Sequence, residues 1–195
     1  MSEKILGIDL GTTNSLVGVV DSGFPILFAD KNGSRITPSV VSYSNNDKPI
    51  VGEAAKRVMS ISPESTFASV KRKIGSKDTF QFDDKELTPE QVSADILIHL
   101  LKIAEEASDE KFTKAVITVP AYFNDSQRIS TKLAAEIAGL EVVRMISEPT
   151  AAAIAYGLDK MDDKSRIAVY DFGGGTFDVS ILELSEGVFQ VLSTS

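Results

Sequence analysis

The 195-residue sequence predicts an α/β fold with a mixed sheet, and three observations lead to that prediction. Short runs rich in β-branched residues alternate along the chain with segments of helical periodicity, which is the pattern of α/β proteins. The segment at residues 5–11 matches the pattern of residues 167–173, an apolar strand that ends in aspartate followed by a bulky apolar residue and glycine, so the chain contains an internal repeat. Hydrophobic residues make up 43% of the chain and charged residues 25%, which suits a folded domain with an apolar core rather than a disordered chain.

The first quarter of the chain is expected to be mainly β-structure. Short apolar runs bounded by turn residues predict strands at residues 5–8, 16–20, 25–28, 40–43 and 50–51. Asp21-Ser22-Gly23 and Asn45-Asn46-Asp47 are turn signals, and the second would let residues 50–51 pair back on the strand before it. A short helix is expected at residues 53–59, and the polar segment 76–86 is expected to be a loop.

A capping signal predicts the next helix. Thr88 and Gln91 form a capping box, and Pro89 occupies the first helical position between them. The buried stripe of this helix is expected to comprise Val92, Ile96, Leu100, Ile103 and Ala107. His99 lies beside the stripe and is interpreted as a structural residue, because the sequence offers no cysteine and no second histidine to join it in a metal site.

The second half of the chain alternates strands with helices. One helix is expected to begin near Asn124 or Asp125 and to end at Gly139, and an alanine-rich helix at residues 149–156 is expected to end at Gly157. Strands are predicted at residues 115–119, 141–146, 167–170, 177–184 and 188–192. This alternation favours a sheet with helices packed against it.

Composition and charge exclude several classes of function. With 20 basic and 28 acidic residues the net charge is -8, so the overall field repels a nucleic-acid backbone. The absence of cysteine excludes disulfides and thiolate chemistry. No apolar run approaches the roughly 20 residues of a membrane-spanning helix, and the N-terminus does not read as a signal peptide. A cytoplasmic protein without a membrane segment is the expectation.

The internal repeat suggests two similar lobes. In each copy an apolar strand ends in an aspartate, followed by a bulky apolar residue and a glycine, and then by a second strand. A turn carrying Gly23 or Gly187 leads to a third strand in each copy. The second copy reaches Ser195 after these three strands, so we expect one full lobe and only the opening strands of another.

The turn of the first copy has the chemistry of a phosphate site. Gly11 lets the backbone bend tightly, and Thr12, Thr13 and Asn14 offer amides and side-chain donors to a phosphate. Asp9 could hold Mg²⁺ through water, because this ion gives up its water shell reluctantly. Taken alone, the pattern is equally compatible with a plain hairpin turn.

The turn of the second copy is more specific. Gly173, Gly174 and Gly175 stand between Asp171 and Asp178, and such a run usually indicates backbone close to a ligand. Its amides and the Thr176 hydroxyl could bind phosphate oxygens, while the carboxylates favour hydrated Mg²⁺. A flexible turn with two solvated acids is the alternative. Asp178 aligns with Leu16 of the first copy, so the first turn carries one acidic residue and the second carries two.

Two similar motifs of other proteins do not apply. Asp171-Phe172-Gly173 spells the magnesium-binding triplet of protein kinases, but no kinase catalytic loop precedes it. Neither turn has the Gly-Lys-Ser/Thr sequence with which a Walker loop opens a helix.

Five segments, in matching order and spacing, resemble a known family. They are Ile8 to Ser15, Val70 to Gly75, Val119 to Asp125, Glu148 to Ala153 with Tyr156-Gly157, and Asp171 to Ser180. With these segments the chain resembles the seventy-kilodalton heat-shock chaperones, most closely the bacterial DnaK type, and more distantly the actin and sugar-kinase superfamily. The resemblance covers essentially the whole chain.

The resemblance implies an actin-like (ribonuclease-H-like) ATPase fold with lobe I complete and the first β-meander of lobe II. Four units are implied: 1–38, the lobe I core with the first phosphate hairpin; 39–112, its peripheral subdomain; 113–164, the lobe I core with the connecting helix; and 165–195, the first strands of lobe II with the second phosphate hairpin.

The resemblance also implies roles for individual residues. Nucleotide contacts would come from Gly11, Thr12, Thr13, Asn14, Gly173, Gly174, Gly175 and Thr176. Asp9 and Asp171 would organise Mg²⁺ through its water shell, with Glu148 and Asp178 nearby. Lys71, Glu148, Asp171 and Thr176 would be the catalytic residues, and Lys71 would help to position the attacking water. Pro120 and Arg128 would relay the nucleotide state.

Without the resemblance, three of these residues have simpler interpretations. Lys71 would belong to a solvated basic turn, Pro120 would end a strand, and Arg128 would be an exposed helix residue.

The implied function is the ATP-binding and ATP-hydrolysing part of a chaperone that controls its binding of unfolded polypeptides through an ATPase cycle. ATP or ADP and Mg²⁺ are the implied cofactors, with K⁺ as a further candidate. A J-domain co-chaperone and a nucleotide-exchange factor are the implied partners of the intact chaperone, and polypeptide would bind only through a C-terminal domain.

Because the family's adenosine-binding segment would follow Ser195, we expect weak ATP binding, slow or absent hydrolysis, and self-association through an unpaired strand edge. A non-catalytic nucleotide- or partner-binding half-domain is the alternative. A sugar-kinase relative is less favoured, because the connecting helix and the segment 119–125 argue against it.

Overall fold

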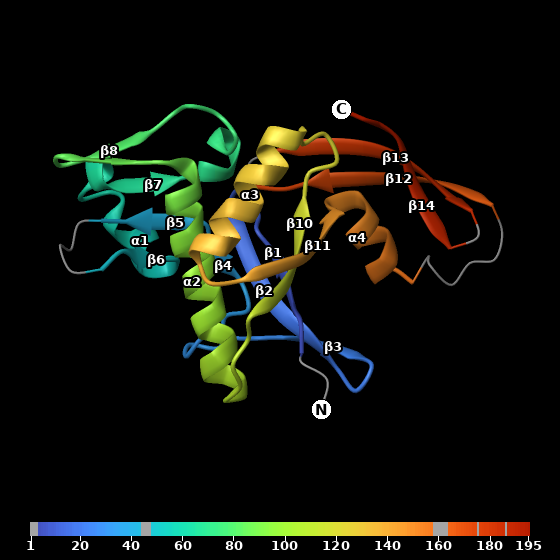
Figure 1. The fold of residues 1–195 in the computed structure, drawn as a ribbon, viewed down its shortest axis with the longest axis horizontal. Coiled ribbons are helices and arrows are strands. Elements are labelled where there is room, and N and C mark those ends of the chain that lie inside the picture. Colours follow the sequence, from blue (N-terminus) through green and yellow to red (C-terminus); the bar gives the residue numbers. More distant parts are fainter. Residues whose placement is uncertain (1–3, 44–47, 158–163, 175, 186) are drawn as a thin grey trace.

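The computed structural model describes residues 4–43, 48–157, 164–174, 176–185 and 187–195. Its central sheet has six strands in the order β11-β10-β1-β2-β3, with β4 paired to β2 (Figure 1). The strands are β1 (Leu6–Asp9), β2 (Asn14–Asp21), β3 (Phe24–Leu27), β4 (Thr37–Pro38), β10 (Lys114–Val119) and β11 (Glu141–Ser147). Strand β1 runs parallel to β10 and antiparallel to β2, so the predicted α/β fold with a mixed sheet is confirmed.

Two smaller sheets and three short helical segments form one end of the molecule, at the left of Figure 1. They comprise β5 (Val40–Ser42), β6 (Ile50–Val51), β7 (Thr66–Ala68), β8 (Phe80–Phe82), β9 (Lys85–Leu87), α1 (Glu53–Val58) and the 3₁₀ turns Pro63–Ser65 and Val70–Lys73. The predicted pairing of β6 on β5 is confirmed by the pair Val41 and Val51. The turn expected at residues 45–47 lies outside the described residues.

The expectation of a loop at residues 76–86 was wrong. Phe80–Phe82 and Lys85–Leu87 form an antiparallel hairpin, whose turn has Asp83 at φ 49°. Phe80 is buried and its ring lies 4.9 Å from that of Phe67. Each of these strands is three residues long and depends on packing against residues distant in sequence. No local sequence pattern therefore predicted them.

The predicted capping box of α2 and the predicted start of α3 are confirmed. Helix α2 (Pro89–Ser108) begins with the Thr88 and Gln91 capping box, and α3 (Asp125–Ile137) begins with a second capping box from Asn124 and Gln127. Helix α4 (Glu148–Ala155) is capped by Ser147.

The predicted buried stripe of α2 is correct except at its end. Val92, Ile96, Leu100 and Ile103 are buried, but Ala107 is exposed. Ala104 closes the buried face instead, so the covered stripe ends one turn before the helix does.

The main core lies between one face of the central sheet and helices α2 and α3, which stand in front of the sheet in Figure 1. The sheet contributes Leu6, Ile8, Ala115 and Ile117, and the helices contribute Leu97, Leu100, Ala134 and Ala135. Because side chains alternate across a strand, the intervening positions Asp9 and Thr118 lie on the opposite face. That face is therefore available for chemistry.

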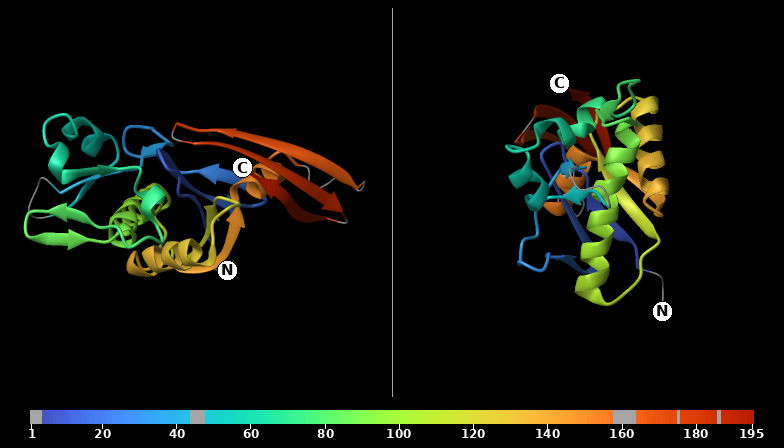
Figure 2. Two further views of the ribbon diagram at one scale, coloured as in Figure 1. Left: turned by 90° about the horizontal axis from the view of Figure 1, so that it is seen from above. Right: turned by 90° about the vertical axis from the view of Figure 1, so that its left-hand side faces the viewer.

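A separate three-stranded antiparallel sheet forms the other end of the molecule (Figure 2). It consists of β12 (Ser165–Phe172), β13 (Phe177–Ser185) and β14 (Val188–Thr194), and α4 packs against β12 and β13. Asp171 pairs with Asp178 across β12 and β13, just as Asp9 pairs with Leu16 across β1 and β2. The predicted repeat is thus a pair of hairpins in the same register.

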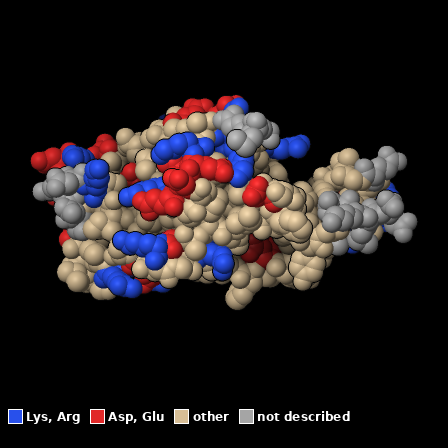
Figure 3. Space-filling model, turned by 90° about the horizontal axis from the view of Figure 1, so that it is seen from below, with Lys and Arg blue, Asp and Glu red and all other residues tan. Residues whose placement is uncertain are grey.

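The surface carries both signs of charge. On the face shown in Figure 3, lysine and arginine side chains lie among aspartate and glutamate side chains rather than in a separate patch. In the described ranges, no helix is both long and apolar enough to cross a membrane.

His99 provides a first prediction, on the dependence of stability on pH. Burial lowers the pKa of His99, the nearby charge of Lys102 lowers it further, and Asp30 and Glu106 oppose the shift. The neutral side chain therefore contributes stability that is present above the unfolded pKa of 6.5 and is lost as the pH falls through the folded pKa.

We expect the stability difference between the wild type and His99→Gln to shrink between pH 7.5 and 5, by about 1.4 kcal/mol for each unit by which the pKa is lowered. Urea unfolding at each pH measures this difference. Because His99 is the only histidine, an NMR titration reads its folded pKa directly, and a value above 6.5 would contradict the prediction.

Candidate functional site

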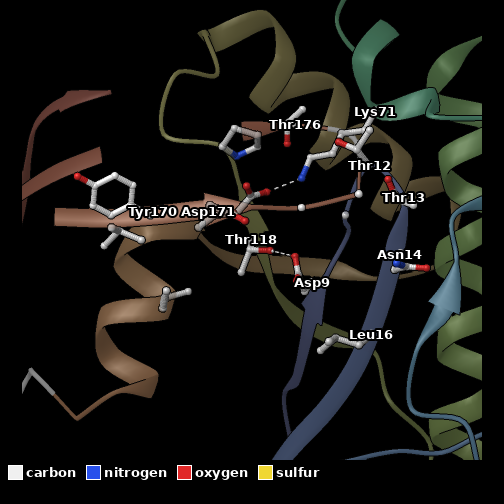
Figure 4. A pocket seen from close by; sticks show the side chains of 18 of the residues that line it. Asp9, Thr12, Thr13, Asn14, Leu16, Lys71, Thr118, Tyr170, Asp171 and Thr176 are labelled. Atoms are coloured by element: carbon white, nitrogen blue, oxygen red, sulfur yellow. Dashed lines mark hydrogen bonds and ion pairs between the residues drawn. The ribbon is translucent and has the colours of Figure 1, made fainter. Parts of the chain in front are cut away.

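A cleft with a volume of about 580 Å³ lies between the two hairpins (Figure 4). Polar lining residues are Asp9, Thr12, Thr13, Asn14, Lys71, Thr118, Tyr122, Glu148, Tyr170, Asp171 and Thr176. The backbones of Gly11, Gly173 and Gly174 complete the polar part, and Ala151, Ala152, Ala155 and Val169 form an apolar wall. The structure thus brings together most of the residues that the sequence singled out.

Gly11 makes a tight turn at the end of β1. A Cβ atom at this position would lie 2.0 Å from the backbone oxygen of Asn14, so only glycine fits. The Gly11 N–H donates to Ser15 Oγ at 3.2 Å, and the Gly11 carbonyl accepts from Ser39 Oγ at 2.8 Å. Ser39 N–H also donates to the Thr13 carbonyl at 2.8 Å. Two serines therefore fix the shape of the first turn.

The second turn meets the first turn directly. A Cβ atom on Gly174 would lie 3.0 Å from Thr13 Cγ2, so this glycine allows the two hairpins to approach each other. Gly173 N–H donates to the Thr176 carbonyl at 3.0 Å and closes the turn. Gly175 lies outside the described residues.

Lys71 and Glu148 form an ion pair within the cleft. Lys71 belongs to the 3₁₀ turn Val70–Lys73, and Glu148 is the first residue of α4. The Lys71 ammonium donates to Glu148 Oε1, and the side chains are only 8% and 19% exposed. Figure 4 shows Lys71 pointing into the site. The simpler interpretation of Lys71 as part of a solvated turn is therefore wrong.

Carboxylates dominate the charge of the cleft. Burial raises the pKa of Glu148, Lys71 opposes the shift, and the charges of Asp9 and Asp171 raise the pKa further. Three acids thus share one buried cation, and their oxygen atoms suit a hard ion such as Mg²⁺. Among the described residues, no three His, Cys, Asp or Glu side chains could hold a metal directly.

Asp178 and Arg128 lie outside the main cleft. Asp178 faces Asp171 across the hairpin and lines a smaller neighbouring pocket, to which Pro120 also contributes. Arg128 Nε donates to the Phe123 carbonyl at 3.1 Å, and Phe123 N–H donates to the Pro120 carbonyl at 3.2 Å. Arg128 is thus linked to Pro120, which lines the cleft, through Phe123.

Sequence reasoning missed several residues around the site, and three of them contact residues that it did name. Phe123 is buried and its ring centroid lies 5.8 Å from Lys71 Nζ. Ser39 holds the first turn, and Thr118 donates to Asp9 Oδ1 at 2.7 Å. A signal existed only for Thr118, because parallel strands end at the same edge of a sheet and bring their last polar residues together. The Ser39 contact depends on tertiary packing alone.

The Ser15 and Ser39 hydroxyls yield a second prediction. Because Ser39 Oγ donates to the Gly11 carbonyl, the 2.9 Å bond between the hydroxyls must be donated by Ser15. Ser39→Ala leaves both that donor and the Gly11 carbonyl without these partners inside a buried network. We expect a loss of about 1–3 kcal/mol in unfolding free energy and roughly three- to tenfold in nucleotide affinity.

Urea unfolding and calorimetric titration measure both effects. Ser34→Ala is the matched control, because Ser34 Oγ donates to the Ile36 carbonyl at 2.8 Å in an exposed turn. Equal effects of the two substitutions would contradict the role of the buried network.

Comparison with known proteins identifies the family. The Hsp70 protein family matches residues 5–84 and 77–195. The chain is 57% identical over 193 residues to the chaperone protein DnaK of Mycoplasma mobile, covering 99% of this chain and 32% of that protein. It is 56% identical over 193 residues to the DnaK of Mycoplasmopsis agalactiae, with the same coverage of 99% and 32%. The chain thus spans about a third of the length of these relatives. Matched in this way over nearly all of its length, it belongs to the Hsp70 family.

Proposed function

We propose that this chain forms the phosphate- and magnesium-binding part of an ATP-hydrolysing chaperone that controls its binding of unfolded polypeptides through an ATPase cycle. The observation that carries the proposal is the meeting of two equivalent hairpins across a cleft that contains a buried lysine and several carboxylates. Membership of the Hsp70 family, for which an actin-like ATPase fold is expected, supports it.

The two hairpins would hold the nucleotide phosphates. Thr12, Thr13, Gly174 and Thr176 line the cleft around the point where the turns meet, so backbone amides and hydroxyls can donate to phosphate oxygens. Gly11, Asn14 and Gly173 line the same region, and Gly175 is assigned with them by resemblance. Leu16 and the alanines of α4 border the region with apolar groups.

Asp9 and Asp171 would hold hydrated Mg²⁺, with Glu148 beside them. When bound, the ion neutralises phosphate charge, which is the main requirement of phosphoryl transfer. Lys71 would add a second positive charge and orient the attacking water, and Glu148 fixes the direction of the Lys71 ammonium. Asp178 would lie near the ion on the neighbouring strand, where it pairs with Asp171.

We assign the units 1–38, 39–112 and 113–164 to lobe I and 165–195 to the first strands of lobe II. Pro120 and Arg128 are the proposed relay of nucleotide state, connected through Phe123 to Lys71. A J-domain co-chaperone, a nucleotide-exchange factor and unfolded polypeptide are the proposed partners of the full-length chaperone. The cytoplasm is the proposed location, on the ground of family resemblance alone.

Calorimetric titration with ATP, in Mg²⁺ and in excess chelator, tests the proposed function. We expect saturable binding that is weaker than micromolar and is strengthened by Mg²⁺. An absence of binding at millimolar ATP would contradict the proposal, and micromolar affinity would contradict only the expected weakness.

A non-catalytic nucleotide- or partner-binding half-domain is the second candidate, because a cleft that can bind phosphates need not hydrolyse them. Single-turnover hydrolysis that Lys71→Ala abolishes would favour the ATPase, whereas partner binding without turnover would favour the half-domain. Turnover stimulated by a sugar would instead favour a sugar kinase.

Exposed aromatic side chains on the second hairpin lead to a third prediction. Tyr170, Phe172 and Phe177 are 71%, 85% and 57% exposed. We expect the 195-residue chain to self-associate through this surface, because such apolar side chains gain by burial. Sedimentation at increasing concentration measures the association. Phe172→Ser should weaken the association severalfold. Ile61→Ser is the control, because Ile61 is 82% exposed but lies outside this hairpin, and it should leave the association unchanged. A chain that stays monomeric at high concentration would contradict the prediction.

A further inference from the structure

A hydrogen bond between two strands of the central sheet fixes the carboxylate of Asp9. Thr118 Oγ1 donates to Asp9 Oδ1 at 2.7 Å, and both residues line the cleft (Figure 4). Hydroxyl-to-carboxylate bonds of this length are among the stronger hydrogen bonds in proteins. The contact therefore restricts the direction in which Asp9 points.

The sheet itself brings these two residues together. Strands β1 and β10 are parallel, and Ile8 pairs with Ile117. One residue further, Asp9 and Thr118 both turn to the face opposite the main core, at the carboxyl edge of the sheet. Their contact requires no loop and is supported by buried neighbours on both strands.

The bond uses one carboxylate oxygen of Asp9 and leaves the other as the acceptor for the cleft. A carboxylate that accepts bonds from the water shell of a metal ion must present its oxygen in one direction, and a partner outside the water shell commonly sets that direction. Thr118 has the geometry of such a partner. Thr118 is also β-branched and suits a strand, so its methyl group alone could serve packing.

We propose that Thr118 is a positioning residue that orients Asp9 toward the hydration shell of a nucleotide-bound divalent cation. This inference rests on the proposed function. The hydroxyl acts through Asp9, and it needs no contact of its own with the nucleotide.

The Mg²⁺-dependent part of nucleotide affinity tests the inference. ADP is titrated calorimetrically with Mg²⁺ and with excess chelator. The dissociation constant in chelator divided by the dissociation constant in Mg²⁺ gives a ratio that is compared between variants. Thr118→Val removes the hydroxyl with little change in volume. We expect it to reduce the ratio by roughly 10–100-fold while the affinity without Mg²⁺ stays within about threefold.

Matched variants separate positioning from packing. Thr118→Ser restores the hydroxyl and should recover most of the ratio. Thr131→Val removes a similar bond, from Thr131 Oγ1 to the Gln127 carbonyl at 2.8 Å within α3, and should leave the ratio unchanged. In an Asp9→Asn background, Thr118→Val should add little, because the two residues act together. If Thr118→Val fails to fold, Thr118→Ala removes the same hydroxyl with less bulk.

The outcomes distinguish the inference from the proposed function. A wild type whose ADP affinity is the same with and without Mg²⁺ contradicts both the inference and the proposed function. A wild type that responds to Mg²⁺, together with a Thr118→Val variant that responds equally, overturns the inference alone. Loss of the response in Thr118→Val that serine does not recover assigns the effect to packing and also overturns it.

Discussion

Lys71→Ala is expected to reduce single-turnover ATP hydrolysis by roughly 10²–10³-fold while changing nucleotide affinity by less than about tenfold. Lys71 supplies the buried cation that pairs with Glu148 in the cleft, so its loss removes positive charge where phosphate charge would develop. It also leaves Glu148 buried without its cation, and the pKa of Glu148, already raised by burial, rises further. The variant should therefore bind nucleotide but fail in the chemical step.

Single-turnover measurements with the chain in excess over labelled ATP detect even slow hydrolysis. Lys73→Ala is the matched control from the same 3₁₀ turn, because the Lys73 side chain is 45% exposed and lies near Asp78 rather than in the cleft. We expect Lys73→Ala to leave the rate unchanged. A Lys71→Ala variant with a rate within tenfold of the wild type would refute the assigned role.

Local signals explain why so much of the fold was predictable. Thr88 with Gln91, and Asn124 at the start of α3, act on the backbone of their own helices, so the sequence alone contains both partners. The repeat was equally informative, since it places Asp9 and Asp171 at equivalent ends of paired hairpins. Such features do not depend on the rest of the chain.

The missed features depend on contacts between distant segments. Hairpin β8-β9 is held by aromatic packing of Phe80 on Phe67, and Ser39 reaches Gly11 across 28 residues of sequence. The burial of Lys71 also depends on distant segments: a run of three basic residues is usually solvated, so only the family resemblance pointed to Lys71 and only the tertiary fold buries it. The sequence thus named residues that the fold brings to one cleft, but it did not identify the distant groups that contact them.

Gly11→Ala is the second substitution with a large expected effect, and the reason is steric. The new Cβ would lie 2.0 Å from the Asn14 backbone oxygen, which cannot move alone because it belongs to the turn that forms the site. The turn must open, and its bonds to Ser15 and Ser39 must lengthen or break. We expect nucleotide affinity to fall by about 100-fold, which corresponds to roughly 2.7 kcal/mol.

Gly7→Ala is the matched control on the same strand, because its Cβ would meet only the Gly18 carbonyl oxygen, at an ordinary 3.9 Å. Calorimetric titration of both variants with ADP and Mg²⁺ should therefore separate the geometry of the turn from a general effect of alanine in β1. Full affinity in Gly11→Ala would mean that the first hairpin does not bind phosphate. Such a result would remove one of the two hairpins on which the proposed function depends, whereas equal losses in both variants would indicate damage to the sheet rather than to the site.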